Sequence, residues 1–262
     1  MSGTGRPAKY CSRACRSRAY RLRQATTSED TTVLTLEAIV SAAVALGDEE
    51  GPDAISMRGT AARLGAGAMS LYRYVAGREV LVDLMVDHVF AEQPLPEPGP
   101  AGWRDKLELS AWAEWAVYRA HPWSARLVAS ITRPPLAPNV MAYTDWRMRA
   151  VDGLGLPFPV MIQVAIMLST HLQGVALGLH AETEAASRLS REEWTALRQE
   201  ALSTALAARE LPMISRFGPA EYDAVTPERM FEFGLGRLLD GIAAMIGPGV
   251  SRDTAEAGTQ PG

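Results

Sequence analysis

Apolar residues recur every three or four positions along most of the chain, which is the period of an α-helix. Leu36, Ile39, Val40 and Ala43 begin the series, and Thr35 before them is a suitable N-cap. The same spacing predicts helices over residues 36–46, 57–64, 68–75, 81–93, 103–120, 123–131, 139–152, 158–182, 190–208 and 227–246. No run alternates β-branched and polar residues as a strand would. The pattern therefore predicts an all-α fold.

Prolines and glycines divide this helical pattern into parts. Residues 94–102 hold four prolines, so they cannot continue a helix and predict a linker. We therefore expect a partly disordered basic extension over 1–32, a three-helix helix-turn-helix domain over 33–93, a linker over 94–102, a larger helical ligand-binding and dimerisation domain over 103–247, and a disordered tail over 248–262.

Two short helices joined by Gly65-Ala66-Gly67 carry the functional signal. A glycine in this turn permits a positive φ, and Leu71 and Val75 are expected to point inward. Met69, Ser70, Arg73 and Tyr74 would then lie on outer faces of the second helix. A short helix with exposed hydroxyl and guanidinium groups suits entry into a DNA major groove. The alternative is a plain helical hairpin inside an enzyme.

Residues 36–89 resemble the DNA-binding domain of TetR-family transcriptional regulators. The resemblance is carried by Ile55-Ser-Met-Arg58, by Ala61-x-x-Leu-Gly65, and above all by Ser70-Leu-Tyr-Arg-Tyr-Val75 followed by Arg78-Glu-Val-Leu81. His121-Pro-Trp123 and Pro138-Asn139 are similar to the ligand-binding domain of the tetracycline-repressor branch. Thr60 departs from the family pattern, which usually has an apolar residue there, and Gly67-Ala68 lacks the usual capping and base-reading side chains.

The resemblance implies roles for residues of this segment. Met69, Ser70 and Arg73 would face the groove, and Arg73 is the candidate for the O6 and N7 atoms of guanine. Tyr72 and Tyr74 would place their hydroxyls on phosphates. Arg58 would reach a phosphate or a base edge, and Arg78 a phosphate. The helix that begins near residue 77 would act as a lever between DNA and the second domain.

Charge is unevenly distributed, and the N-terminus is basic. Residues 1–28 hold seven basic residues and no acidic one, whereas residues 29–262 hold 19 basic and 30 acidic residues. We expect Arg6, Lys9, Arg13 and Arg16 to contact DNA phosphates or a minor groove, although a solubilising tail is the alternative. The segment resembles half of a zinc ribbon, but Cys11 and Cys15 lack a second ligand pair. We therefore expect no metal and no cofactor, with zinc between subunits left open.

Aromatic residues and methionines are concentrated after the linker. A helical domain that holds an apolar effector would be lined by such groups, although core packing uses the same residues. The candidate effector contacts are Trp112, Trp115, Tyr118, Tyr143, Trp146, Met167 and His171. For His171 alone, a hydrogen-bonded core histidine is the simpler interpretation.

Residues 153–181 carry no Asp, Glu, Lys or Arg, so the stretch is long and apolar enough to be a candidate membrane span. Polar residues and glycines interrupt the stretch, which favours a helix buried on most sides in a core and a subunit interface rather than in lipid. One recognition helix reads few base pairs, so we expect a homodimer. Its candidate interface residues are Gly174, Gly178, Leu235, Leu238 and Ile242, with contacts inside one chain as the alternative.

These features together predict a ligand-responsive transcriptional repressor. It would bind a palindromic double-stranded DNA operator as a homodimer and be released by a small, largely apolar effector. No catalytic motif stands out, so an enzyme is disfavoured. A constitutive DNA-binding regulator without effector is the other alternative. Two cysteines and no apolar N-terminal signal indicate the cytoplasm, with no membrane partner.

Overall fold

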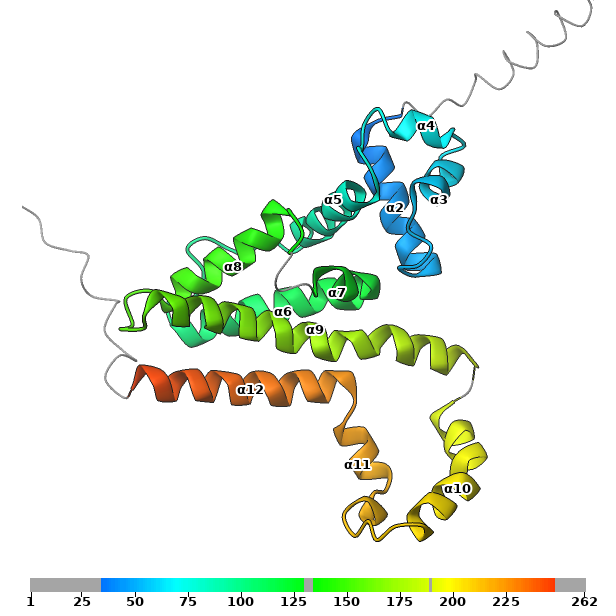
Figure 1. The fold of residues 1–262 in the computed structure, drawn as a ribbon. Helices are drawn as coiled ribbons and strands as arrows, with labels where there is room; N and C mark the ends of the chain where they lie inside the picture. The colour runs from blue at the N-terminus through cyan, green and yellow to red at the C-terminus, as the bar shows by residue number, and fades with distance from the viewer. Residues whose placement is uncertain (1–33, 130–133, 189, 248–262) are drawn as a thin grey trace, which may run out of the picture.

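The computed structural model describes residues 34–129, 134–188 and 190–247, and within these ranges every regular element is helical. Figure 1 shows the arrangement. The helices are Leu36–Glu50 (α2), Met57–Arg63 (α3), Ala68–Leu71 (α4), Arg78–Ala91 (α5), Trp103–Ala120 (α6), Pro122–Val128 (α7), Pro138–Val151 (α8), Phe158–Arg188 (α9), Arg191–Ala207 (α10), Pro219–Ala224 (α11) and Pro227–Ile246 (α12), with a short 3-10 turn at Ile214–Arg216. The all-α prediction is confirmed.

Side-chain caps begin the first two helices, and the cap at Thr35 is the one that the sequence predicts. The Thr35 hydroxyl accepts a hydrogen bond from the Ala38 amide at 3.1 Å, and the Ser56 hydroxyl accepts one from the Gly59 amide at 3.0 Å. The prediction that α2 stops before Gly47 is wrong. The helix continues to Glu50 and ends at Gly51, where φ is +83°. Gly47 is tolerated inside the helix because the indole of Trp123 lies against it, leaving no room for a side chain.

Helix α5 leaves the α2–α4 unit and packs into the second part of the molecule (Figure 1). Leu81, Met85 and Val89 on its inner face are fully buried. The helix contacts α2 at one side and α6, α7 and α8 at the other. A single core therefore runs from Ile39 in α2 to Ile242 in α12.

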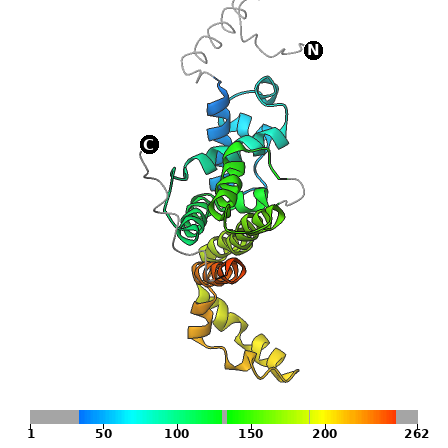
Figure 2. The ribbon, with the colours of Figure 1, turned by 90° about the vertical axis from the view of Figure 1, so that its left-hand side faces the viewer.

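Helix α9 is the centre of the second part. It contacts α6, α7, α8 and α12, and α12 runs beside it in both views (Figures 1 and 2). Helices α10 and α11 extend away from this pair as an arm. The linker also belongs to this body, because the Tyr143 hydroxyl donates to the Gln93 carbonyl at 2.5 Å and the Trp146 indole donates to the Pro96 carbonyl at 3.3 Å.

Helix α9 ends later than predicted, and one helix that was not predicted is present. Helix α9 runs past residue 182 to Arg188, because alanine and glutamate are strong helix formers even where the apolar period has ended. Helix α11 was not predicted, since six residues are too few for the period to register; Gly218 and Pro219 start it.

The apolar stretch in α9 is only partly enclosed by its own chain. Phe158–Leu179 has a mean hydropathy of 1.6 and passes a length-and-composition test for a membrane span, but only 28% of its most apolar window is buried. The core helix of a soluble protein passes the same test. Within one chain, only one face of α9 meets the other helices, so burial on most sides would also need the predicted subunit interface. Its other face presents Phe158, Ile162, Met167 and Leu177.

Candidate nucleic-acid interface and ligand cavity

The turn between α3 and α4 has the predicted geometry. Gly65 has φ of +64°, which a β-carbon would disfavour, and the Ala66 amide donates to the Ala61 carbonyl at 2.9 Å to close the turn. Helix α4 is shorter than predicted, covering four residues rather than residues 68–75. The chain tightens after it, where the amides of Tyr74 and Val75 both donate to the Leu71 carbonyl at 2.9 Å.

Residues 69–75 separate into anchors and exposed groups. Leu71 and Val75 are fully buried in the core. Met69 is 79% exposed, Tyr72 and Tyr74 are more than two-fifths exposed, and Arg73 is exposed. Ser70 is half-buried. The candidate base-reading and phosphate-reading side chains thus project from a segment that two apolar residues fix in place.

The candidate phosphate contacts outside this segment have different surroundings. Arg58 is exposed on the first turn of α3. Arg78 is exposed, but its Nε donates to the Ile55 carbonyl at 3.0 Å, so the side chain ties the start of α5 to the segment that leads into α3. Arg6, Lys9, Arg13 and Arg16, with Cys11 and Cys15, lie outside the described residues.

An ion pair that the sequence analysis missed fixes α3 to α2. Both guanidinium nitrogens of Arg63 contact the carboxylate of Glu49, and this hydrogen bonding lowers the pKa of Glu49. The two residues are 14 positions apart, beyond the reach of any helical spacing rule. The pair orients α3, on which the turn to α4 depends.

The predicted effector aromatics are mostly core residues. Trp115 and Tyr118 are buried, and the Trp115 ring stacks on Phe231 with centroids 4.7 Å apart. Trp112 is 43% exposed and meets Phe231 edge-on at 4.6 Å. Tyr143 and Trp146 hold the linker. None of these five residues lines either of the two cavities described below, because the same apolar composition serves the packing of α6 against α12 and of α8 against the linker.

A buried ion pair lies between α6, α8 and α9. Arg147 Nη1 is 2.7 Å from Glu114 Oε2, and both side chains are at most 2% exposed. Ser110 receives two further hydrogen bonds from Arg147, and the Tyr118 hydroxyl donates to Glu114 Oε1 at 2.5 Å. Burial, with the nearby Glu114 carboxylate, raises the pKa of Tyr118 well above its usual value. No local pattern predicts this pair, because Glu114 and Arg147 are 33 positions apart on different helices.

A cavity of about 470 Å³ opens between α7, α8 and α9. Its walls are largely apolar, including Val140, Met141, Met148 and Phe158. Its polar lining comes from Thr144 and Asp145 of α8 and from Ser169, Thr170 and Gln173 of α9. The volume lies in the range of small-molecule sites.

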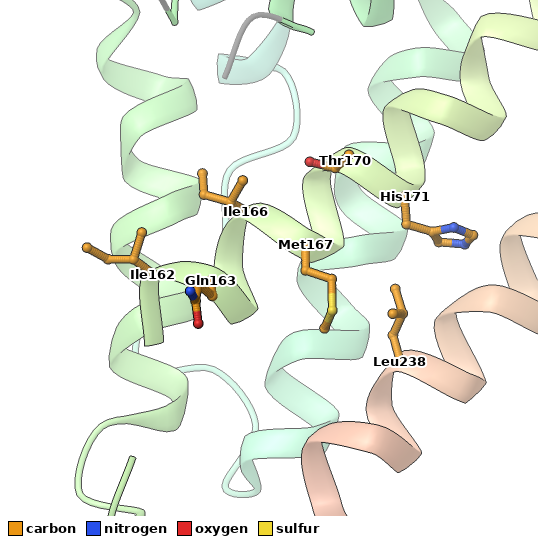
Figure 3. Close-up of a pocket in the computed structure, with 7 residues that line it drawn as sticks. All are labelled: Ile162, Gln163, Ile166, Met167, Thr170, His171 and Leu238. Atoms are coloured by element: carbon orange, nitrogen blue, oxygen red, sulfur yellow. The ribbon is translucent and has the colours of Figure 1, made fainter. Parts of the chain in front are cut away.

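A second, shallower hollow lies on the outer face of α9 and α12. Figure 3 shows its seven lining residues: Ile162, Gln163, Ile166, Met167, Thr170, His171 and Leu238. Met167 and His171 belong to this hollow. The His171 ring packs against Gly234, where an added β-carbon would lie 2.1 Å from the ring, and its Nε2 is 3.4 Å from the Phe231 carbonyl. His171 is therefore held as an intrachain residue.

The candidate subunit-interface residues divide into accessible residues and residues buried within their own chain. Gly174 is exposed and Leu238 is half-buried, so both are accessible from outside. Leu235 is 3% exposed and Ile242 is fully buried, which places them in the core of their own chain. Gly178 faces Pro227 of α12. The assignment of Leu235 and Ile242 to a subunit interface is wrong for a physical reason: they share the inner stripe of α12 with Phe231 and Leu239.

A polar cluster joins the α2–α4 unit to the second part of the molecule. His121 Nδ1 is 2.8 Å from Asp48 Oδ1, and His121 Nε2 is 3.1 Å from Glu92 Oε2. The Trp123 indole also donates to Asp48 Oδ1 at 2.6 Å. These residues come from the ends of α2, α5 and α6 and the start of α7. In the sequence, His121-Pro-Trp123 stands out only as a family signature, and no local pattern predicts its contacts with Asp48 and Glu92.

Within the described residues, no group of three or more His, Cys, Asp and Glu side chains is arranged to hold a metal ion. The two cysteines lie outside those residues.

Comparisons with known proteins agree with this architecture. Residues 95–246 match the family model described as "Tetracyclin repressor-like, C-terminal domain". The chain is 36% identical over 223 residues to the HTH-type transcriptional repressor DrrR1 of Streptomyces coeruleorubidus, covering 81% of this chain and 78% of the relative. It is 34% identical to an HTH-type transcriptional regulator of Saccharopolyspora erythraea, covering 82% and 87%.

Solved structures support the same assignment. The Streptomyces coelicolor TetR family protein ActR, in complex with actinorhodin, aligns with a TM-score of 0.62 and 30% identity, covering 82% of this chain and 99% of ActR. Members of the family regulate transcription and are not enzymes. From its helix-turn-helix unit, its helical second domain and these matches, the chain belongs to the TetR family of transcriptional regulators.

Proposed function

We propose that this protein is a transcriptional repressor that binds a palindromic operator as a homodimer, with α4 and the turn after it in the major groove. The observation that carries this proposal is the exposure of Met69, Arg73 and Tyr74 around the buried anchors Leu71 and Val75. Arg73 would pair with guanine, Ser70 and Met69 would contact neighbouring base edges, and Tyr72, Tyr74 and Arg58 would contact phosphates. Arg78 would position α5 and meet phosphate with its remaining donors.

The dimer would form through the outer face of α9 and α12. Ile162, Met167 and Leu177 are each more than a third exposed there, and exposed apolar patches of this kind mark interaction sites. Gly174 and Leu238 lie on the accessible side of the same pair. A four-helix contact between two copies would cover the hollow in Figure 3 and set the spacing of the two recognition segments.

The second domain would respond to a small, largely apolar effector. The cavity between α7, α8 and α9 supports this, as does the description of the related ActR in complex with actinorhodin. An effector that binds better to one arrangement of the domains would shift the spacing of the recognition segments and release the operator. Such a regulator would act in the cytoplasm, where it would reach its operator DNA. Helix α5 would transmit the change, since it touches both units.

The test is selection of duplexes from a random library, followed by Arg73→Ala. We expect a palindromic site, and we expect the variant to lose preference at one position per half-site, by about 1–3 kcal/mol of discrimination. Binding to the selected and scrambled duplexes is measured by fluorescence anisotropy at fixed salt. Arg126→Ala, an exposed arginine on α7, is the matched control and should leave base preference unchanged. Unaltered preference in Arg73→Ala would remove it from base reading.

A further inference from the structure

The cavity between α7, α8 and α9 shares two residues with the buried polar network. The Ser169 hydroxyl lines the cavity, accepts a hydrogen bond from Arg147 Nη1 at 2.7 Å and donates to Glu114 Oε2 at 3.2 Å. Gln173, one helical turn further along α9, also lines the cavity, and its side-chain amide acts on the Tyr118 hydroxyl to lower the pKa, against the larger effect of burial. The polar end of the cavity is therefore bonded directly to α6.

The charges behind this wall are already paired. Arg147 and Glu114 form their ion pair with each other, and their remaining hydrogen bonds go to Ser110, Ser169 and Tyr118. Asp145, the charged residue in the lining, contacts Arg149 at 2.9 Å, but its side chain is 69% exposed and it shares Arg149 with Glu97. An anionic ligand entering this cavity would lose water and meet no cation in the lining, so it would bind more weakly than a neutral ligand.

Helix α6 carries the network toward the DNA-binding unit. Glu114 and Tyr118 are one turn apart, and His121 follows at the end of the same helix. His121 lies between Asp48 of α2 and Glu92 at the end of α5. A ligand that competes for Ser169 or Gln173 would change the hydrogen bonds that fix α6, and the His121 contact is the next polar link to α2.

We propose that the cavity binds a neutral, mainly apolar ligand whose one hydrogen-bonding end meets Ser169 and Gln173, and that α6 transmits its binding to the Asp48–His121 contact. This proposal rests on the proposed function, which it deepens by naming the ligand class and the residues that report occupancy.

Two probes with one ring skeleton test the ligand class. N-phenyl-1-naphthylamine is neutral with a single N–H, and 8-anilino-1-naphthalenesulfonate is the same skeleton with a sulfonate. Binding of each to the full chain is followed by fluorescence titration. We expect the neutral probe to bind one site per chain. The sulfonate should bind that site with an affinity that is lower by roughly tenfold or more. Equal affinities would overturn the neutral class.

Variants locate the site. Met148→Trp fills the cavity and should abolish binding of the neutral probe, whereas Met213→Trp, at an exposed methionine next to the 3-10 turn, should leave it unchanged. Ser169→Ala should weaken it severalfold, and Ser169→Thr, which restores a hydroxyl, should recover most of it. Unchanged binding in Met148→Trp, with circular dichroism showing a folded chain, would overturn the site.

Coupling is measured as the change in neutral-probe affinity when a selected duplex is bound. Reciprocity requires the probe to weaken DNA binding by the same factor. In the wild type we expect the probe to bind more weakly when the duplex is bound. The ratio of the two probe affinities should approach one in Ser169→Ala and in Asp48→Asn. An unchanged factor in both variants, or no coupling in the wild type, would overturn transmission through α6. A chain that binds the probe but no duplex would instead refute the proposed function and leave the ligand class standing.

Discussion

Thr60 is a polar residue in the otherwise apolar core of the helix-turn-helix unit, and its burial lowers the free energy of unfolding. It is fully buried in α3, and its hydroxyl oxygen has no hydrogen-bond partner within the part of the chain that the structure describes. An unpaired buried hydroxyl costs about 1–3 kcal/mol.

Thr60→Val should therefore stabilise the protein by about 1 kcal/mol, because it keeps the shape and removes the unpaired group. Thr35→Val is the matched control and should destabilise by a similar amount, because Thr35 caps α2. Urea unfolding at one protein concentration measures both. A loss of stability in Thr60→Val would mean that the hydroxyl is satisfied in solution.

At the Glu114–Arg147 pair, in contrast to Thr60, removing one polar side chain should destabilise the protein. Arg147→Met leaves Glu114 buried without its counter-ion and should cost about 3–5 kcal/mol. The double variant Glu114→Leu with Arg147→Met removes both charges and should recover much of that loss. A double-mutant cycle built from free energies of unfolding in urea gives the coupling energy between the two charges. Additive losses would show that the two charges are not coupled.

At the scale of elements, the close approach of α9 and α12 depends on one glycine. A β-carbon at Gly234 would lie 2.1 Å from the His171 ring, so Gly234→Ala should destabilise by about 1–3 kcal/mol. His171→Ala in the same chain should relieve the clash. Gly236, with no atom within 4 Å of its added β-carbon, is the control: Gly236→Ala should stabilise slightly, since alanine favours helix. Thermal unfolding measures all three.

Helices could be predicted where residues close in the sequence determine them. Their boundaries could not be predicted where packing against a distant residue decides where a helix ends. The cap at Thr35 and the linker prolines located two transitions correctly. Gly47, by contrast, looks like a helix stop, yet Trp123 packs on it and the helix continues. The partner that overrides the rule is 76 positions away, so no window along the sequence contains both residues.

At the scale of the whole molecule, the unpaired apolar face of α9 and α12 makes a prediction about assembly. Met167→Glu places a charge in the hollow of Figure 3 and should shift the protein from dimer to monomer in sedimentation velocity. Met213→Glu, at a methionine that is 65% exposed beside the 3-10 turn, should leave the oligomeric state unchanged. A wild-type chain that sediments as a monomer at all concentrations would contradict the proposed interface.

Sequence alone determined the helical class, the helix-turn-helix segment and its exposed residues, because these depend on period, caps and glycine positions within a few residues of each other. Tertiary structure decided which aromatic residues are core, which face of α9 stays open, and that Ser169, Gln173, Glu114 and Arg147 meet beside a cavity. These contacts join helices far apart in the chain. Burial and charge pairing there are properties of the packed helices, and no local pattern encodes which faces will meet.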